Sequence, residues 1–106
     1  SLVQIVADIG ASGAVTLDVN DSSPDVTITL STTGQYAITY PACETAAVLG
    51  AHSLLAEAVG SSIYFEALSP TAGTGSFETA VTTAGATAAE PASGTRFFIT
   101  LLCGQN

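Results

Sequence analysis

Charged side chains are scarce in this sequence. Asp, Glu, Lys and Arg make up 9% of its 106 residues, and Lys and Arg together are represented once, by Arg96. Methionine and tryptophan are absent. A soluble monomer usually carries about a quarter charged residues. We therefore expect an exposed surface built from Ser, Thr, Gly and Ala, or a surface that other subunits cover in large part.

The lack of basic residues excludes two classes of partner. Proteins bind nucleic acid with basic side chains that displace counterions from phosphates, and a chain of net charge −8 with one arginine cannot do this. The same reasoning disfavours anionic membrane surfaces. An apolar run of about 20 residues, the length that spans a bilayer, is also missing. We expect no nucleic-acid partner and no membrane association.

Few residues are suited to catalysis or metal binding. His52 is the only histidine, and no serine has the sequence of a nucleophile elbow around it. The glutamates are scattered, so the sequence fixes no pair of them as an acid–base couple. Cys43 and Cys103 have no metal-binding spacing. We expect no enzymatic activity and no cofactor.

The two cysteines allow two interpretations. A disulfide between Cys43 and Cys103 would close a long loop and stabilise the fold by about 4 kcal/mol in the chain-entropy model. Alternatively, both are small buried apolar side chains, which is how unpaired cysteines usually behave. The low cysteine content favours the second interpretation and leaves the first open.

Alternation of apolar and polar side chains is the main structural signal in the sequence. It is clearest in residues 25–40, DVTITLSTTGQYAITY, where two extended halves flank a Ser-Thr-Thr-Gly turn. Gly34 can adopt a positive φ there at no steric cost. The apolar side chains fall at every second position of each half: Val26, Ile28, Leu30, Tyr36, Ile38 and Tyr40. We predict a hairpin, although a four-residue connection can also cross to a second sheet.

Similar segments fill most of the remaining chain. Extended stretches are predicted at 3–9, 14–20, 52–59, 63–68, 77–82 and 96–103, with loops at 69–76 and 84–95. In the second stretch Val15, Leu17 and Val19 are expected to face inward. Residues 46–59 are rich in alanine and admit a short helix, but Gly50 interrupts one, so we favour a strand from 52.

The strand count and spacing predict the fold class. About eight segments separated by turn residues are typical of an antiparallel β-sandwich or jelly roll. We predict an all-β domain of about eight to ten strands that spans residues 1–106, with almost no helix.

The last segment, RFFITLLC from Arg96 to Cys103, is the most apolar. Apolar residues on both of its faces predict burial on both sides, either in the centre of the domain or against another subunit. Arg96 is the sole Lys or Arg residue, so we expect it to pair with an aspartate or glutamate, within the protomer or across a subunit boundary.

Two groups of polar or aromatic residues suggest binding sites. Oxygen-bearing side chains cluster around one turn at Asp18, Asn20, Asp21 and Asp25, a density that can hold calcium. The glycine and distal glutamate of a helix-loop-helix calcium site are missing, so we favour a solvated acidic turn. Sugars stack on tyrosine rings, and the three tyrosines are Tyr36, Tyr40 and Tyr64. Their positions in strands favour core or interface roles instead.

One part of the chain resembles a known family. VTITLSTTGQYAITY, followed by ETAAVLGAHSLLAEAVG, resembles the compact jelly rolls related to the globular head of the first complement component and tumour necrosis factor. It looks most like the bacterial and phage members that cap collagen-like stalks, including collagen-like spore-surface proteins. The similar features are Gly34-x-Tyr36-x-Ile38-x-Tyr40, a small-residue linker and a final apolar strand. The resemblance implies a tight trimer that acts as a structural or adhesive head.

These observations predict a non-enzymatic, self-assembling module on the outside of a virion, spore or cell. It would be a trimeric head, or a decoration or fibre subunit, and its partners would be its own copies, glycans, or a capsid or stalk protein. The expected subunit interface consists of Tyr36, Ile38, Tyr40, Phe97, Phe98 and Leu102. The alternatives are a carbohydrate-binding module and a filament subunit whose N-terminal segment, residues 2–9, adds a strand to the next subunit.

Overall fold

The computed structural model describes residues 2–41, 53–59, 63–70, 73–80 and 88–102. Over these residues the regular structure is almost entirely strand, as alternation predicted, and the single helical element is one short 3-10 turn. The elements are β1 (Leu2–Ile9), η1 (Ala11–Gly13), β2 (Val15–Leu17), β3 (Thr27–Thr32), β4 (Gln35–Thr39), β5 (Ser53–Val59), β6 (Tyr64–Pro70), β7 (Thr74–Ala80) and β8 (Arg96–Leu102).

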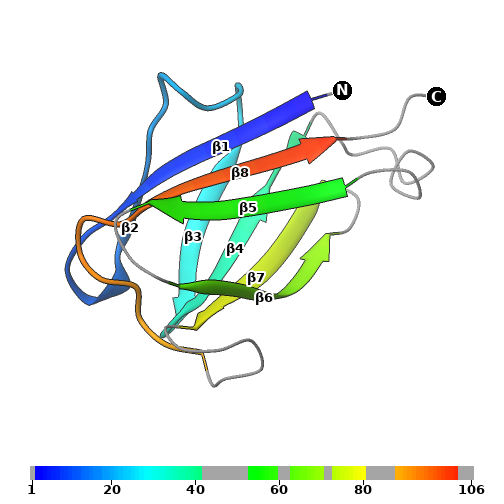
Figure 1. Cartoon of the computed structure of the whole chain (residues 1–106). Coiled ribbons are helices and arrows are strands. Elements are labelled where there is room, and N and C mark those ends of the chain that lie inside the picture. Colours follow the sequence, from blue (N-terminus) through cyan, green and yellow to red (C-terminus); the bar gives the residue numbers. More distant parts are fainter. Residues whose placement is uncertain (1, 42–52, 60–62, 71–72, 81–87, 103–106) are drawn as a thin grey trace.

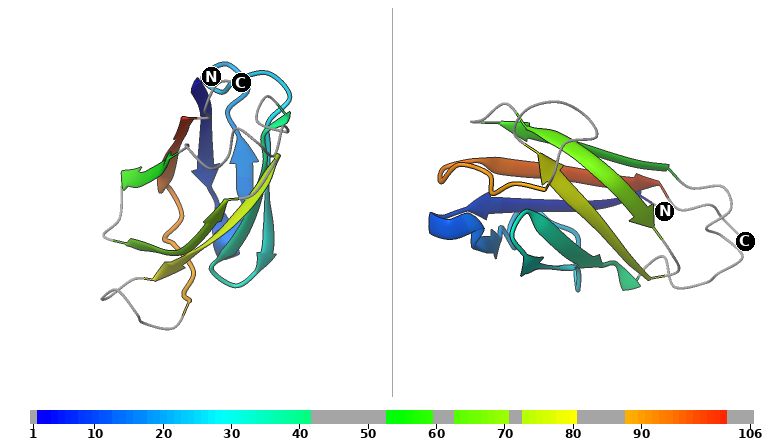
Figure 2. Two further views of the ribbon diagram at one scale, coloured as in Figure 1. Left: turned by 90° about the vertical axis from the view of Figure 1, so that its right-hand side faces the viewer. Right: turned by 90° about the horizontal axis from the view of Figure 1, so that it is seen from below.

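The strands form two antiparallel sheets that face each other, so the predicted all-β sandwich is confirmed (Figures 1 and 2). The first sheet has the order β2-β1-β8-β5 and the second sheet has the order β3-β4-β7-β6. In the first sheet, β1 and β8 lie side by side from Leu2 opposite Leu102 to Asp8 opposite Arg96. The two ends of the described chain therefore form the centre of one sheet.

The predicted hairpin of residues 25–40 is confirmed, with a tighter turn than expected. Thr32 pairs with Gln35, so only Thr33 and Gly34 form the loop, and Gly34 has φ +71°. The register shifts between Leu30 and Thr32. Leu30 itself still pairs in register with Tyr36 and is 37% exposed, whereas Ile28, two residues earlier in the strand, is buried.

The core lies between the inner faces of the two sheets. Its buried side chains come at every second position of the central strands: Val3, Ile5, Ala7, Ile9, Val26, Ile28, Tyr36, Ile38, Tyr40, Phe97, Ile99 and Leu101. The Phe97 ring meets the rings of Tyr36 and Phe65 edge to face, with centroids 5.4 and 5.3 Å apart. The buried phenols are satisfied by backbone, since Tyr36 donates to the Gly13 carbonyl at 2.8 Å and Tyr40 donates to the Thr74 carbonyl.

Most of the predicted subunit interface is therefore wrong. Tyr36, Ile38, Tyr40 and Phe97 are at most 1% exposed within one protomer, so they cannot contact another. Alternation correctly grouped each set on one face, but that face meets the opposing sheet. Phe98 lies half-buried on the outer face of β8. Leu102 ends β8, and its side chain is outside the described residues.

Three further expectations need correction. The second strand ends at Leu17, because Asp18 starts a turn, and Val19 is 73% exposed rather than inward-facing. The loop predicted at 69–76 is in its described parts the end of β6 and the start of β7. The alternative that β8 is buried on both faces within the domain is wrong, since Phe98 and Thr100 on the outer face are partly exposed; burial of that face against another subunit stays a prediction. The strand favoured from residue 52 is confirmed as β5.

The buried Tyr36 phenol should titrate at unusually high pH. Burial, and then the charge of Glu90, raises the pKa of Tyr36 to about 12 from an ordinary value of 10.0. Because the fold favours the neutral phenol, this stabilisation is complete below about pH 10 and is lost as the pH rises through 12. We expect a tyrosine absorbance titration to contain a step near pH 12 that Tyr36→Phe removes. A titration unchanged by this substitution would contradict the burial of this phenol.

Candidate functional site

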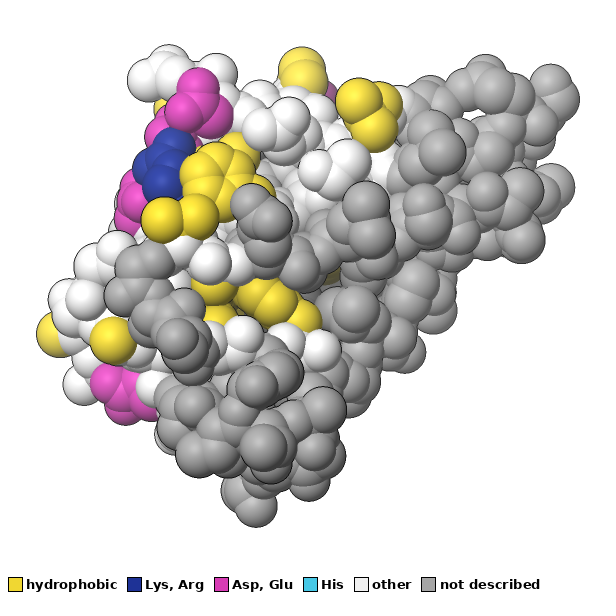
Figure 3. All heavy atoms as spheres, in the orientation of Figure 1, with side chains coloured by type: hydrophobic (Ala, Val, Ile, Leu, Met, Phe, Trp, Pro, Cys, Tyr) yellow, Lys and Arg dark blue, Asp and Glu magenta, His cyan; other side chains and the backbone are white. Residues whose placement is uncertain are grey.

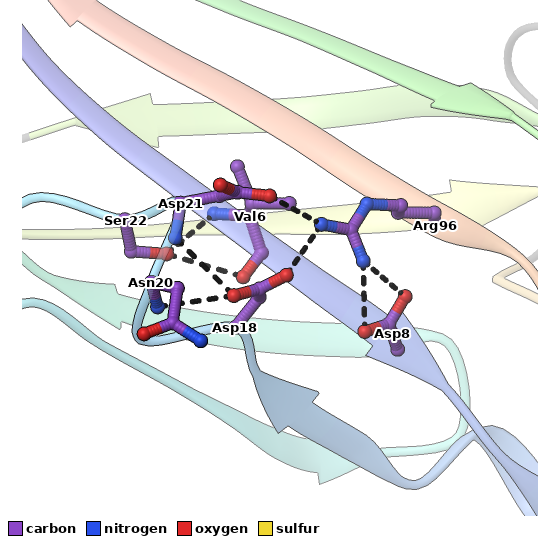
Figure 4. Close-up of polar contacts among 7 residues, drawn as sticks. All are labelled: Val6, Asp8, Asp18, Asn20, Asp21, Ser22 and Arg96. Atoms are coloured by element: carbon purple, nitrogen blue, oxygen red, sulfur yellow. Dashed lines mark hydrogen bonds and ion pairs between the residues drawn. The ribbon is translucent and has the colours of Figure 1, made fainter.

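The chain's one arginine holds three aspartates on the outer side of the first sheet (Figure 4). Arg96 Nη1 donates to both carboxylate oxygens of Asp8, at 2.8 and 2.9 Å. Its Nη2 donates to Asp18 Oδ2 at 2.5 Å and to Asp21 Oδ2 at 3.0 Å. We call these four residues the Arg96 cluster. The predicted pairing of Arg96 with an aspartate is confirmed, and it lies within one protomer.

Strand pairing and a turn bring the cluster together. Asp8 and Arg96 are direct cross-strand partners of β1 and β8, so their side chains share a face. Asp18 Oδ1 accepts the backbone N–H groups of Asn20 and Asp21, at 3.0 and 3.2 Å. A carboxylate that binds the backbone two and three residues ahead bends the chain into a tight turn. This bend brings Asp21 to the same guanidinium as Asp18.

The residues that follow tie this turn to the edge of β1. The Asp18 N–H donates to the Val6 carbonyl at 2.8 Å. The Ser22 hydroxyl accepts from the Val6 N–H at 2.9 Å and donates to the Val6 carbonyl at 3.2 Å. The Ser23 hydroxyl accepts from the Gln4 N–H, and the Ser23 backbone N–H donates to the Gln4 carbonyl, both at 2.8 Å. Residues 18–23, here called the 18–23 turn, thus continue the line of β2 along β1, and Val6 is fully buried.

The charges in the cluster support one another. The hydrogen bond from Arg96 lowers the pKa of Asp18; partial burial opposes this, and the backbone N–H donors of the turn add to it. The same bonds raise the pKa of Arg96. Because the pKa of Asp18 is depressed from 3.8, its contribution to stability is present above that pH and is lost as the pH falls through the lower folded value.

Apolar side chains lie on the outer face of the first sheet, two of them beside the cluster and the third, Leu2, at the opposite end of β1, where it pairs with Leu102. The Arg96 guanidinium carbon is 5.5 Å from the centroid of the Phe98 ring, a cation–π distance. Val59 of β5 is paired with Arg96 and is 55% exposed, and Leu2 at the start of β1 is 68% exposed. We call Leu2, Val59 and Phe98 the outer apolar face. Figure 3 shows this side of the molecule, with hydrophobic side chains next to the arginine.

The calcium candidates do not converge on a common point. Asp18 and Asp21 point to Arg96, whose guanidinium takes the place a cation would need between them. Asp25 belongs to a separate surface pocket of about 520 Å³, lined by Leu2, Val3, Ser23, Pro24, Asp25, Val26 and Pro41. Within the described ranges, no cluster of His, Cys, Asp and Glu has the arrangement of a metal site.

The other residues considered for binding or catalysis either are buried or lie outside the described residues. Tyr36 and Tyr40 are core residues, so their rings cannot form the sugar platform considered from the sequence. The Tyr64 side chain lies outside the described residues, as do Cys43, Cys103 and His52. The pocket beside Asp25 has that carboxylate as the one ionisable side chain of its described lining. A single carboxylate provides no acid–base pair.

Comparison with family models, curated proteins and solved structures finds no match. In the portions of the chain that the structure describes, no helix is both long and apolar enough to cross a bilayer. The case for a function therefore depends on the cluster and the outer apolar face themselves.

Sequence reasoning missed several residues of this surface. Asp8 would have been found by aligning the first strand against the last, since that register pairs it with Arg96. Leu2 and Val59 were assigned to strands, but their outward direction depends on which sheet each strand joins. Ser22 and Ser23 belong to no alternating pattern of apolar and polar residues. Their hydroxyls accept the N–H groups of Val6 and Gln4, which the carbonyls of a neighbouring strand would otherwise accept.

Removing the cation of the cluster should free the 18–23 turn. We expect Arg96→Gln to leave the three aspartates uncompensated, to lower the urea midpoint and to speed hydrogen exchange of the Val6 amide. Asp8→Asn is the matched control, because the Asp8 side chain is 54% exposed and the amide oxygen of the substituted side chain can still accept from Arg96. Unchanged exchange at Val6 in Arg96→Gln would show that the cluster does not hold the turn.

Proposed function

We propose that this chain is a non-enzymatic, self-associating structural module on the outside of a virion, spore or cell, either a trimeric head or a decoration or fibre subunit. The observation that carries the proposal is the outer apolar face. Leu2 and Val59 expose 68% and 55% of their surface, and Phe98 is partly exposed on the same sheet. The chain has only 9% charged residues to solvate such a surface.

Covering this face would be favourable. Removing apolar surface from water contributes about 25 cal/mol per Å², so a modest shared patch is worth several kcal/mol. Contiguous exposed apolar patches of soluble proteins commonly mark interaction sites.

Another copy of the chain is the favoured partner. The positive charge of Arg96 is already matched by three aspartates of its own protomer, so it is not available to an acidic ligand. An apolar surface without free positive charge suits a similar apolar surface better than a polyanion. Self-association therefore fits the described surface better than binding to nucleic acid or to an anionic membrane.

The strand order does not supply the trimer. β1 pairs with β8 in one sheet and β4 pairs with β7 in the other, but β1 and β2, β3 and β4, and β6 and β7 are neighbours within a sheet, so successive strands do not alternate between the two sheets. The trimer is inferred from the family that the sequence resembles.

The filament alternative is less favoured. Residues 2–9 form β1, which is paired with β8 from Leu2 to Asp8 and supplies Val3, Ile5, Ala7 and Ile9 to the core. Donating this strand to a neighbour would empty the protomer's own core. A carbohydrate-binding role has lost two of its three tyrosines to the core.

Substitution on the outer apolar face tests the proposal. We expect Phe98→Thr to weaken assembly by about tenfold or more, the effect of losing roughly 1.4 kcal/mol of contact energy, while the protomer stays folded. Leu30→Thr is the matched control, since Leu30 is an exposed apolar residue of the other sheet. Sedimentation velocity over a dilution series measures the association of both variants. Equal association in the parent and Phe98→Thr would refute this face as the interface.

A further inference from the structure

Three of the four sheet edges are protected against pairing with another strand. β2 has three residues, and the 18–23 turn occupies the rest of that side of β1. The register of β3 shifts just before Thr32. β6 also has a register shift, and it ends at Pro70, which has no N–H to donate. Short strands, bulges and prolines are the means by which β proteins avoid edge-to-edge association.

The fourth edge, β5, has none of these features. Ser53–Val59 pairs with β8 at every position without a register shift, and its sequence SLLAEAV contains neither proline nor glycine. Glu57 is its single charged residue. β5 ends the first sheet (Figures 1 and 2), and no described strand lies on its other side. In an edge strand, alternate backbone N–H and C=O groups point away from the sheet.

We propose that β5 pairs with β5 of a second copy of this chain, antiparallel about a two-fold axis, so that the two first sheets join into one. The inference rests on the proposed self-association and adds a second contact to it. An exposed, regular and largely uncharged edge is a template for strand addition, and an antiparallel pair of identical strands is self-complementary under two-fold symmetry.

The sequence of β5 fits such a pair. A register centred on Ala56 pairs the whole strand from Ser53 to Val59 and places Glu57 opposite Leu55 of the second copy, so that no two carboxylates are directly opposed. The other charges of this acidic chain lie outside the strand. Val59, the last residue of β5, belongs to the outer apolar face, so the joined sheet would continue that face across both copies.

The same register predicts how salt acts. The two Glu57 residues become diagonal neighbours, at about 7–8 Å between backbone positions. Repulsion at this range is reduced by salt, because the Debye length is about 8 Å at physiological ionic strength. Pairing through β5 should therefore be tighter at high salt, and Glu57→Gln should remove this dependence.

Proline substitutions at two adjacent positions of β5 distinguish loss of the contact between copies from loss of protomer stability. Neighbouring residues of a strand direct their N–H groups to opposite sides, so one of Leu55→Pro and Ala56→Pro removes a bond to β8 and the other removes a donor of the free edge. The variant whose thermal unfolding midpoint stays close to the parent's is the edge variant. We expect it to weaken the two-fold contact by about tenfold or more. In the parent, alternate amides of β5 should gain hydrogen-exchange protection as protein concentration rises.

The outcomes distinguish the two proposals. If the folded proline variant associates like the parent and β5 exchange is independent of concentration, the β5 contact is refuted. If Phe98→Thr still weakens assembly in that case, the outer apolar face stands without the edge contact. A parent that stays monomeric at submillimolar concentration overturns both.

Discussion

Replacing Phe97 with alanine is expected to lower the free energy of unfolding by about 3–5 kcal/mol, the usual loss for a fully buried phenylalanine. Phe97 is 0% exposed. Its ring meets Tyr36 of β4 and Phe65 of β6 edge to face, so one side chain of the first sheet contacts two strands of the second. Removing it leaves a cavity between the sheets and eliminates both aromatic contacts.

The neighbouring phenylalanine provides the control. Phe98 lies on the other face of the same strand and is partly exposed, so Phe98→Ala should cost less than Phe97→Ala in the dissociated protomer, about 1 kcal/mol. Chemical denaturation at low protein concentration measures both variants without the contribution of assembly. Equal losses for the two substitutions would contradict the assignment of inner and outer faces to β8.

The second large effect is expected at Gly34. A Cβ atom added there would lie 2.6 Å from both the backbone nitrogen and the carbonyl oxygen of Ala89. Those atoms belong to the chain that covers the β3–β4 turn, so no side-chain rotation can relieve the clash. Gly34 also has φ +71°, which costs an alanine about 1–2 kcal/mol. We expect Gly34→Ala to destabilise the fold by about 3 kcal/mol or more, since strain and displacement of backbone add.

Gly94→Ala separates the cost of the positive φ from the cost of the clash with Ala89. Gly94 has φ +92°, but an added Cβ would have no atom within 4 Å. This variant should show the conformational cost alone, about 1–2 kcal/mol. Thermal unfolding of the parent and of both variants measures how much more Gly34→Ala lowers the stability than Gly94→Ala does. If Gly94→Ala were as destabilising as Gly34→Ala, the close packing of the turn against Ala89 would be wrong.

Local patterns predicted the strands well because a period of two is a property of the backbone. The alternation of Val26, Ile28, Tyr36 and Ile38 identified the hairpin and the residues that share a face. It could not say what that face meets. The scarcity of charge suggested a subunit boundary, whereas the structure places these residues between its own two sheets.

The Arg96 cluster shows that contacts between residues far apart in the sequence could not be predicted from local patterns. The need of Arg96 for a carboxylate was predictable from composition, but Asp8 is separated from it by 88 positions. Only the pairing of the first strand with the last brings them together. Asp18 and Asp21 were correctly recognised as neighbours in space, but they were expected in a solvated acidic turn, with calcium as the weaker alternative, because the guanidinium that binds them comes from a distant strand.

With four of the expected interface residues in the core, the proposed self-association depends on Leu2, Val59 and Phe98 and on the edge of β5. These lie on one sheet and leave the second sheet free. A module that assembles through one sheet can present the other to its surroundings, as a surface head or decoration subunit requires.

Sedimentation equilibrium of the unaltered chain is the most direct measurement of self-association. At concentrations from micromolar to submillimolar, the account predicts a mass that is a multiple of the 10.5 kDa protomer: three copies if the trimeric contact forms alone, and an even number of copies if the two-fold β5 contact forms as well. A mass of 10.5 kDa throughout that range, for a cooperatively folded protein, would contradict it.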